Sequence, residues 1–230
     1  MSIYWLYGLE AILVTLFIFS RASKQAVGSV FNKALASVAF VMAGIVAINK
    51  MGYTDAFGYL LLGAVFGLIG DIFMELNLTD EQNAFGHINA GMASFGMGHL
   101  LYLVALVLLY GSFSEYLVQF FISLGVSLAF AGVLVFVLAK PLKLDFGRAK
   151  WQSASYAFVL TFATVFSLML SIKTNSHWIM TAGFGAFLVS DMILSMQLFG
   201  GKKDNMVLSV LVHVFYYAAQ MAIVSQIAFL

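Results

Sequence analysis

Residues 57–76 read FGYLLLGAVFGLIGDIFMEL, an almost wholly apolar run that carries one aspartate, Asp71, well inside it. A second run, residues 178–199, places Asp191 at a similar point. Each aspartate directly follows a small residue, Gly70 or Ser190. A run of about 20 apolar residues is long enough to cross a bilayer as a helix. Because an acidic side chain at the membrane centre costs roughly 2.5 to 3.5 kcal/mol, each aspartate predicts a functional site.

The composition excludes a soluble domain. Of the 230 residues, 63% are hydrophobic and 9% are charged, and the mean hydropathy is +1.00. These values indicate an integral membrane protein, in which any chemistry must take place between helices. A net charge of +1 without a basic stripe argues against a nucleic-acid partner. The chain has no cysteine, which excludes disulfides and thiolate metal sites.

The predicted fold is all-α, a bundle of transmembrane helices that forms one domain over residues 1–230. A chain of this length has room for roughly eight spans with short connections. The first residues lack the basic leader of a cleaved signal, so we expect the first span to be retained. The spans are expected at residues 3–20, 34–49, 57–76, 88–110, 116–139, 151–172, 178–199 and 206–229.

The basic residues predict the orientation. Of the 11 Lys and Arg residues, only Lys50 and Lys173 fall in even-numbered loops. Basic loops stay in the cytoplasm, so the odd loops are predicted to be cytoplasmic and both termini to lie on the other side. The nine residues in odd loops are Arg21, Lys24, Lys33, Lys140, Lys143, Arg148, Lys150, Lys202 and Lys203.

The two aspartate spans suggest an internal duplication. When they are aligned on their aspartates, Gly63 falls on Gly183, and the next span carries a His-x-x-Tyr motif in each case. Two such pairs, four helices apart and in the same orientation, are typical of a parallel 4+4 repeat. Chance similarity between short apolar helices is the alternative.

Both aspartates are predicted to lie at one depth. Each follows the start of its span by about 13 residues, which is near 20 Å at 1.5 Å per residue and puts the site in the cytoplasmic half. Gly63, Gly67 and Asp71 recur every four residues, so this face can approach another helix closely. The simpler interpretation is small-residue packing, with the carboxylates held by hydroxyl groups or paired with a lysine.

Other polar residues lie in the spans that follow the aspartates. His99 and Tyr102 share one helical face, and Tyr216, Tyr217 and Gln220 crowd the last span. These side chains can bind a carboxylate, orient a water molecule or hold a polar headgroup. Ordinary hydrogen bonds between helices, typically worth about 0.6 kcal/mol each, are the alternative.

Four further polar residues have two interpretations each. Glu75, one turn after Asp71, is either a second acid or a boundary residue that snorkels to the interface, and the boundary position is favoured. Lys33 is expected at the start of the second span, where it is topogenic or reaches an anionic phosphate. Glu10 and His213 contribute either to the site or only to packing.

The motifs disfavour several kinds of chemistry. Acidic and histidine side chains in these spans are plausible metal ligands, but they form no His-x-x-x-His pair or cluster of three histidines on one face. We therefore expect no metal and no cofactor. The chain also lacks the Gly-x-Ser-x-Gly elbow of serine hydrolases and any glycine-rich phosphate loop.

Four ordered motifs resemble the YhhN-like, or lysoplasmalogenase, family of eight-span membrane proteins. The likeness covers roughly residues 30–225. Two departures stand out: Lys33 is followed by Ala34 where a proline is expected, and Phe215 replaces a threonine. The motifs are GLIGD at 67–71, FGMGHLLY at 95–102, GAFLVSD at 185–191 and YYAAQ at 216–220.

The resemblance implies an enzyme that cleaves the vinyl-ether bond of lysoplasmalogens, releasing a fatty aldehyde and a glycerophosphoethanolamine or glycerophosphocholine. Such a bond breaks by protonation at carbon, and water then captures the oxocarbenium ion. This sequence needs one protonated carboxyl group and one carboxylate, roles that Asp71 and Asp191 can share. The expected partners are a lysophospholipid and the bilayer, and the expected location is a bacterial inner membrane.

Two other classes of protein fit the same residues. A proton-coupled transporter or lipid-handling channel also uses acidic residues near the middle of the membrane. The single proline, Pro141, lies in a loop and gives no sign of the broken helices that transporters often use. An assembly or regulatory protein would leave both aspartates unexplained.

Overall fold

The computed structural model describes residues 3–202 and 205–229 and confirms the predicted fold class. Eight helices in this part of the chain are long and apolar enough to cross a membrane, and no strand occurs among the described residues. The protein is therefore an integral membrane protein. The helices are α1 (Ile3–Ala22), α2 (Ala26–Met51), α3 (Asp55–Leu76), α4 (Ala84–Tyr110), α5 (Leu117–Gly132), α6 (Lys150–Thr174), α7 (Trp178–Leu198) and α8 (Met206–Ser225).

Short segments of other helical types extend or precede these helices. A π-helical segment, Val133–Leu138, continues α5, and a 3-10 turn, Gln226–Phe229, continues α8. Three further 3-10 turns, Glu81–Asn83, Phe113–Tyr116 and Gly147–Ala149, lie in connections. The side chains of Thr54 and Asn205 cap α3 and α8 by accepting from Phe57 N and Leu208 N.

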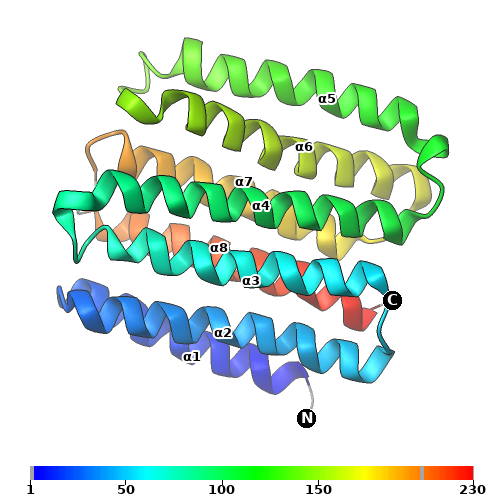
Figure 1. Ribbon diagram of the computed structural model, residues 1–230, viewed down its shortest axis with the longest axis horizontal. Coiled ribbons are helices and arrows are strands. Elements are labelled where there is room, and N and C mark those ends of the chain that lie inside the picture. Colours follow the sequence, from blue (N-terminus) through cyan, green and yellow to red (C-terminus); the bar gives the residue numbers. More distant parts are fainter. Residues whose placement is uncertain (1–2, 203–204, 230) are drawn as a thin grey trace.

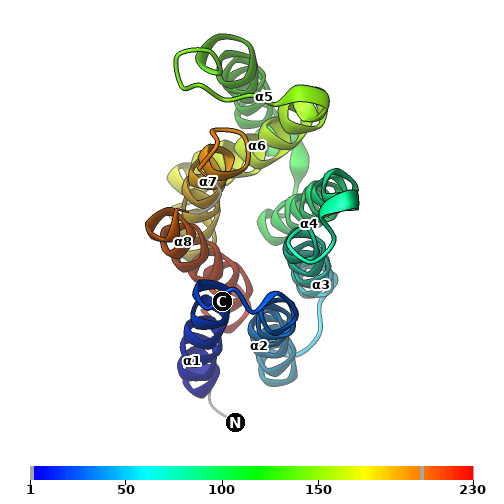
Figure 2. The same ribbon diagram turned by 90° about the vertical axis from the view of Figure 1, so that its left-hand side faces the viewer.

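The helices form two facing layers (Figures 1 and 2). One layer contains α2, α3 and α4, and the other runs from α1 through α8 and α7 to α6. The helices pack as antiparallel pairs, α1 with α2, α3 with α4, α5 with α6 and α7 with α8, and α8 also contacts α1, α2 and α3. Helix α5 lies at one edge of the bundle, against α6. The layers bring α3 and α7, the two aspartate helices, to opposite sides of one interior.

The second span begins earlier than the sequence suggests. Helix α2 starts at Ala26, not at residue 34, so Lys33 lies two turns inside the helix instead of at its start. The predicted span began directly after Lys33 because a charged residue usually marks the boundary of a membrane span. In the structure, Lys33 is buried against the acidic side chains of Asp71 and Glu75. The proposed 4+4 repeat and the assignment of one domain over 1–230 remain predictions.

Glycines allow the closest approach between α3 and α4. A Cβ atom added to Gly63 would lie 3.0 Å from the carbonyl oxygen of Gly98 and against the ring of Tyr102. Only a residue without a side chain fits between these helices. In the same way, a Cβ on Gly67 would collide with the Gln220 amide of α8. The glycine face predicted from the sequence thus packs against two helices, and Asp71 continues it.

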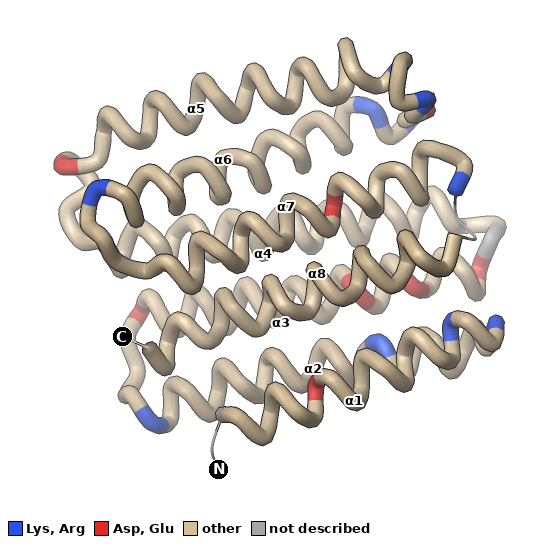
Figure 3. The backbone as a smooth tube through the Cα atoms, turned by 180° about the vertical axis from the view of Figure 1, so that it is seen from behind, with Lys and Arg blue, Asp and Glu red and all other residues tan. Residues whose placement is uncertain are grey.

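All four odd-numbered connections lie at one end of the bundle, as Figure 1 shows. Most described Lys and Arg residues gather at that end in Figure 3. Lys50 and Lys173 instead lie in the last turns of α2 and α6, which lead into the even-numbered connections at the other end. The charge difference predicted from the sequence is therefore a difference between two ends of the molecule. The odd-loop end is the one we expect in the cytoplasm.

Because the chain has no cysteine, single cysteines can report the orientation. Ser23 in the first loop and Ser112 in the fourth are both exposed. We expect Ser112→Cys to react with a membrane-impermeant maleimide in intact cells. The Ser23→Cys variant, a matched exchange at the other end, should react only after permeabilisation. The reverse pattern would show that the orientation is wrong.

Candidate functional site

Asp71 of α3 is held by three groups from two other helices. Its Oδ2 atom accepts hydrogen bonds from Ser37 Oγ of α2 at 2.6 Å and from Tyr216 OH of α8 at 2.6 Å. The Lys33 Nζ atom lies 3.4 Å from its Oδ1 atom. Asp71 is 2% exposed. All three neighbours present protons to the carboxyl group, an arrangement that suits a carboxylate.

Glu75 lies one turn further along α3 and belongs to the same charged cluster. It accepts from Arg21 Nη1 at 2.7 Å and from the Ser29 hydroxyl, and Lys33 Nζ lies 3.5 Å away. Its side chain is 0% exposed, so the favoured prediction of a snorkelling boundary residue is wrong. The reason is that α1 and α2 supply two cations over this end of α3. Two carboxylates and two cations therefore balance.

A chain of hydrogen bonds runs from Asp71 across the bundle. Tyr102 OH donates to Gln220 Oε1 at 2.6 Å, and Gln220 Nε2 donates to Tyr216 OH at 3.2 Å. Tyr217 OH donates to the Lys33 carbonyl oxygen at 3.3 Å. These predicted site residues thus converge on Asp71 and fix its partners. None of Tyr102, Tyr217 and Gln220 lines either of the pockets described below.

Asp191 of α7 has a different environment. It accepts a hydrogen bond from Tyr156 OH of α6, and the Tyr156 hydroxyl also lies 3.4 Å from His99 Nε2. The His99 ring is buried edge-on against Phe187, with ring centroids 4.4 Å apart. Its Nδ1 atom has no hydrogen-bond partner within the described residues. His99 is therefore connected to Asp191 through the Tyr156 hydroxyl and not to Asp71. It does not line either pocket.

Glu10 and His213 flank the charged cluster. Glu10 of α1 is buried, and its Oε1 atom has no hydrogen-bond partner in the described part of the chain. The Nδ1 atom of His213 lies 2.7 Å from the carbonyl oxygen of Ser209, and its ring packs edge-on against Phe17. Of the two residues, His213 lines a pocket and Glu10 does not.

Both aspartates line one polar pocket with an empty volume of about 470 Å³. Arg21, Lys33 and Tyr216 also line it. The sequence places the aspartates on spans far apart in the chain, and the two-layer fold brings them to the same cavity. This pocket is a suitable place for an acid and a carboxylate to act on one molecule.

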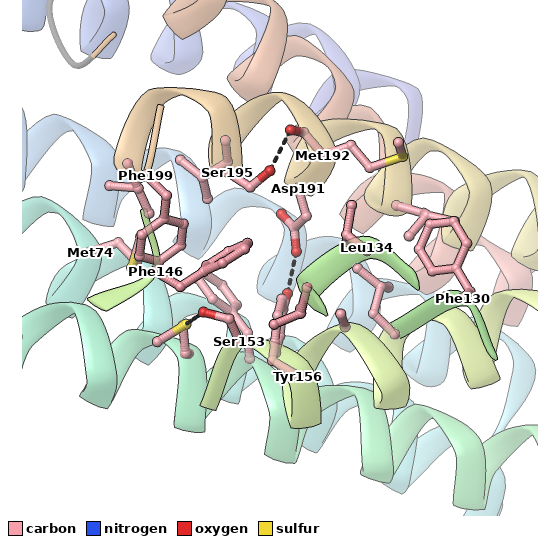
Figure 4. Close-up of a pocket in the computed structure, with 18 residues that line it drawn as sticks. Met74, Phe130, Leu134, Phe146, Ser153, Tyr156, Asp191, Met192, Ser195 and Phe199 are labelled. Atoms are coloured by element: carbon pink, nitrogen blue, oxygen red, sulfur yellow. Dashed lines mark hydrogen bonds between the residues drawn. The ribbon is translucent and has the colours of Figure 1, made fainter. Parts of the chain in front are cut away.

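An apolar pocket lies beside the polar one, lined mainly by α6 and α7 with residues of α3, α4 and α5 (Figure 4). Its empty space is about 700 Å³, open surroundings included. Asp191 lines it as well and points towards Tyr156 there. The two pockets therefore meet at Asp191. The residues that line both are Met74, Phe95, Asp191, Leu194 and Leu198.

Three partners of the acidic residues were not predicted from the sequence. Ser29 and Ser37 flank Lys33 at intervals of four residues, so the three share a face of α2. Gly67, Asp71 and Glu75 also recur every four residues and share a face of α3. A search for the same interval in the second span would have found Ser29 and Ser37 as neighbours of Lys33. Tyr156 is the single tyrosine of the sixth span and has no acidic or basic residue four positions away, so it gives no such signal.

The described residues contain no group of three or more His, Asp or Glu side chains arranged to hold a metal ion.

Residues 28–227 match the sequence model of a family described as the YhhN family. The match confirms the resemblance carried by the four motifs. No curated protein and no solved structure gives a significant match.

The cluster predicts a specific pattern of stability. Lys33→Met would leave Asp71 buried without its cation, and we expect it to destabilise the protein by about 3 kcal/mol. Adding Asp71→Asn to that variant removes the uncompensated charge and should recover much of the loss. Lys140→Met, at an exposed position, is the control. Unfolding curves in a denaturing detergent measure all three, and equal loss in Lys33→Met and Lys140→Met would contradict the pairing.

Proposed function

The chain belongs to the YhhN family, and on that premise we propose that it is an intramembrane hydrolase of lysoplasmalogens. In this proposal it cleaves the vinyl-ether bond and releases a fatty aldehyde and a glycerophosphoethanolamine or glycerophosphocholine. The observation that carries the proposal is that Asp71 and Asp191 line one pocket, next to a second pocket that is apolar. A polar cavity with two acids, one of which also borders an apolar cavity, suits a lipid with a reactive bond near its headgroup.

The different surroundings of the two aspartates suggest their roles. Asp191 has a single hydroxyl donor and also lines the apolar pocket, so we assign it the proton that goes to carbon. Asp71, with two hydroxyl donors and the Lys33 ammonium around it, is assigned as the fixed carboxylate that stabilises positive charge. Tyr216, Gln220 and Tyr102 keep Asp71 in position through their chain of hydrogen bonds.

The reaction then has two stages. The double bond supplies the electron pair for a new bond between its outer carbon and the proton of Asp191, which leaves an oxocarbenium ion next to Asp71. Water adds to the carbon that bears the ether oxygen and returns a proton to Asp191. The resulting hemiacetal separates into an aldehyde and an alcohol. A similar pair of carboxyl groups around an oxocarbenium ion acts in glycoside hydrolysis, as an analogy of mechanism only.

The orientation expected from the basic loops would put this site in the cytoplasmic half of a membrane, and we propose a bacterial inner membrane. Transport of protons or lipids by the same aspartates is the rival function. The two differ in one requirement. A hydrolase releases aldehyde from a lysoplasmalogen in detergent micelles, whereas a transporter acts only across a sealed bilayer.

Removing either acid should abolish the chemistry. We expect Asp71→Asn and Asp191→Asn each to lower the turnover number by about 10² to 10⁴, because each removes a group that acts on the transition state. Folding should change little, since Lys33 keeps its pair with Glu75. Aldehyde release by the purified proteins in micelles is the measurement. Asp55→Asn, at an exposed position in the first turn of α3, is the control, and near-full activity of either site variant would contradict the pairing.

Tyr156 should act by positioning Asp191. Tyr156→Phe removes the hydroxyl that donates to Asp191, and we expect the turnover number to fall by roughly tenfold, the effect of losing one buried hydrogen bond. Tyr110→Phe is the matched control, because it removes hydrogen bonds to Ser171 and Ser176 near the other end of the bundle. If both variants lose activity equally, the effect of Tyr156→Phe is general and Tyr156 has no special role.

A further inference from the structure

The polar and apolar pockets differ in composition but share five lining residues, of which Asp191 is the one with a polar side chain. The polar pocket is lined by two cations, Arg21 and Lys33, and by the two carboxyl groups of Asp71 and Asp191. The polar side chains of the apolar pocket are Ser153, Tyr156, Asp191 and Ser195, and hydrocarbon or aromatic groups line the rest of it. Asp191 lies at the junction.

From this junction we infer that the two pockets form one bipartite site for a single-chain phospholipid. The phosphate lies at Arg21, the hydrocarbon chain lies in the apolar pocket, and the linkage between them passes Asp191. This inference deepens the proposed function, which supplies the class of lipid. It assigns the hydrocarbon chain of the lipid to the apolar pocket. It also gives Arg21 a role in phosphate binding, in addition to its role in membrane orientation.

The guanidinium of Arg21 is well placed for a phosphate. Arg21 is the penultimate residue of α1, so it lies at the odd-loop end of the bundle, and its side chain is 19% exposed. Its Nη1 atom donates to Glu75. A guanidinium has five N–H donors in a planar fork, which leaves others free to bind a phosphate at the polar pocket. A lipid lying in a membrane likewise has its phosphate at the interface and its chain inside.

The apolar pocket has the shape that a chain needs. Along α7 its lining runs from Leu188 to Leu198, a rise of about 15 Å at 1.5 Å per residue. Met192 on its lining is 39% exposed, so the pocket lies next to the outer surface of the bundle.

The π-helical segment forms one wall of this pocket. Leu134 and Val135 come from Val133–Leu138 and line it, as Asp191 does, and Leu134 is labelled in Figure 4. Such segments are rare in helices and are frequent at functional sites. Phe130 of α5 and Ala157 of α6 continue the lining. The irregular backbone and the pocket thus coincide.

A non-cleavable lipid tests the site without requiring catalysis. The probe is a saturated 1-O-hexadecyl lysophosphoethanolamine with a diazirine near the chain end, added to the purified full chain in lipid nanodiscs. We expect photolabelling of residues 130–135 and 153–160, suppressed by excess unlabelled lipid of the same kind. Labelling confined to outer faces, or unaffected by that competitor, would overturn the inference.

Pocket-filling variants test the chain-binding part. Leu134→Trp and Ala157→Phe should each weaken binding of the 16-carbon probe by roughly tenfold and leave an 8-carbon analogue nearly unchanged, because the lost space is hydrocarbon-binding space. The matched controls are Val137→Trp, at a position 60% exposed, and Ser155→Phe, also exposed. If the controls shift the chain-length preference as much as the pocket variants, the assignment is wrong.

Arg21→Gln tests the phosphate-binding part. It should weaken the phosphate-bearing probe by roughly tenfold but not 1-O-hexadecylglycerol, which lacks the phosphate. Lys24→Gln, exposed in the same loop, is the control, and Arg21→Lys should retain part of the affinity if Arg21→Gln folds poorly. Equal weakening of both lipids would overturn the role of Arg21. Probe binding as expected without vinyl-ether cleavage would refute only the proposed function, whereas cleavage with labelling elsewhere would refute only the bipartite site.

Discussion

The buried ion pair between Lys33 and Asp71 is the interaction around which the bundle is organised. A carboxylate that is 2% exposed in an apolar interior is unfavourable unless a charge and hydrogen-bond donors surround it. The chain provides these from α2 and α8. Helices α2, α3 and α8 must therefore meet at one point, and Gly67 of α3 lets α8 approach closely enough. The same requirement fixes the position of Tyr216 and, through it, of Gln220 and Tyr102.

The two aspartates share a cavity but not an environment. Asp71 is surrounded by polar groups that keep it in place, whereas Asp191 has Tyr156 as its hydrogen-bond donor and faces an apolar pocket. Two similar residues in different surroundings can perform different steps of one reaction. This difference leads to the proposed division of roles, and the junction of the two pockets explains why Asp191 would be the residue nearest the reactive bond of a lipid.

The sequence predicted the arrangement of the helices more accurately than it predicted the contacts between their side chains. Eight spans follow from hydropathy, and the grouping of basic residues at one end follows from the same span limits. The start of α2 was misplaced because Lys33 was taken as the polar boundary in front of an apolar run. Its burial is explained by the acidic residues of α3 that face it, which only the structure shows. For the same reason Glu75 looked like a boundary residue. His99 and Tyr156 could not be assigned to Asp191 from the sequence, because that grouping depends on how α4, α6 and α7 pack.

The most direct test of the central claim is the fate of isotopes from solvent during turnover of a lysoplasmalogen. Protonation at carbon followed by capture of water predicts that, in D₂O, the aldehyde carries one deuterium on the carbon next to its carbonyl group. In H₂¹⁸O, the released glycerophospho-alcohol should keep its original oxygen. Incorporation of ¹⁸O into that alcohol, or aldehyde without deuterium at that carbon, would contradict an acid-catalysed opening of the vinyl ether by the paired aspartates.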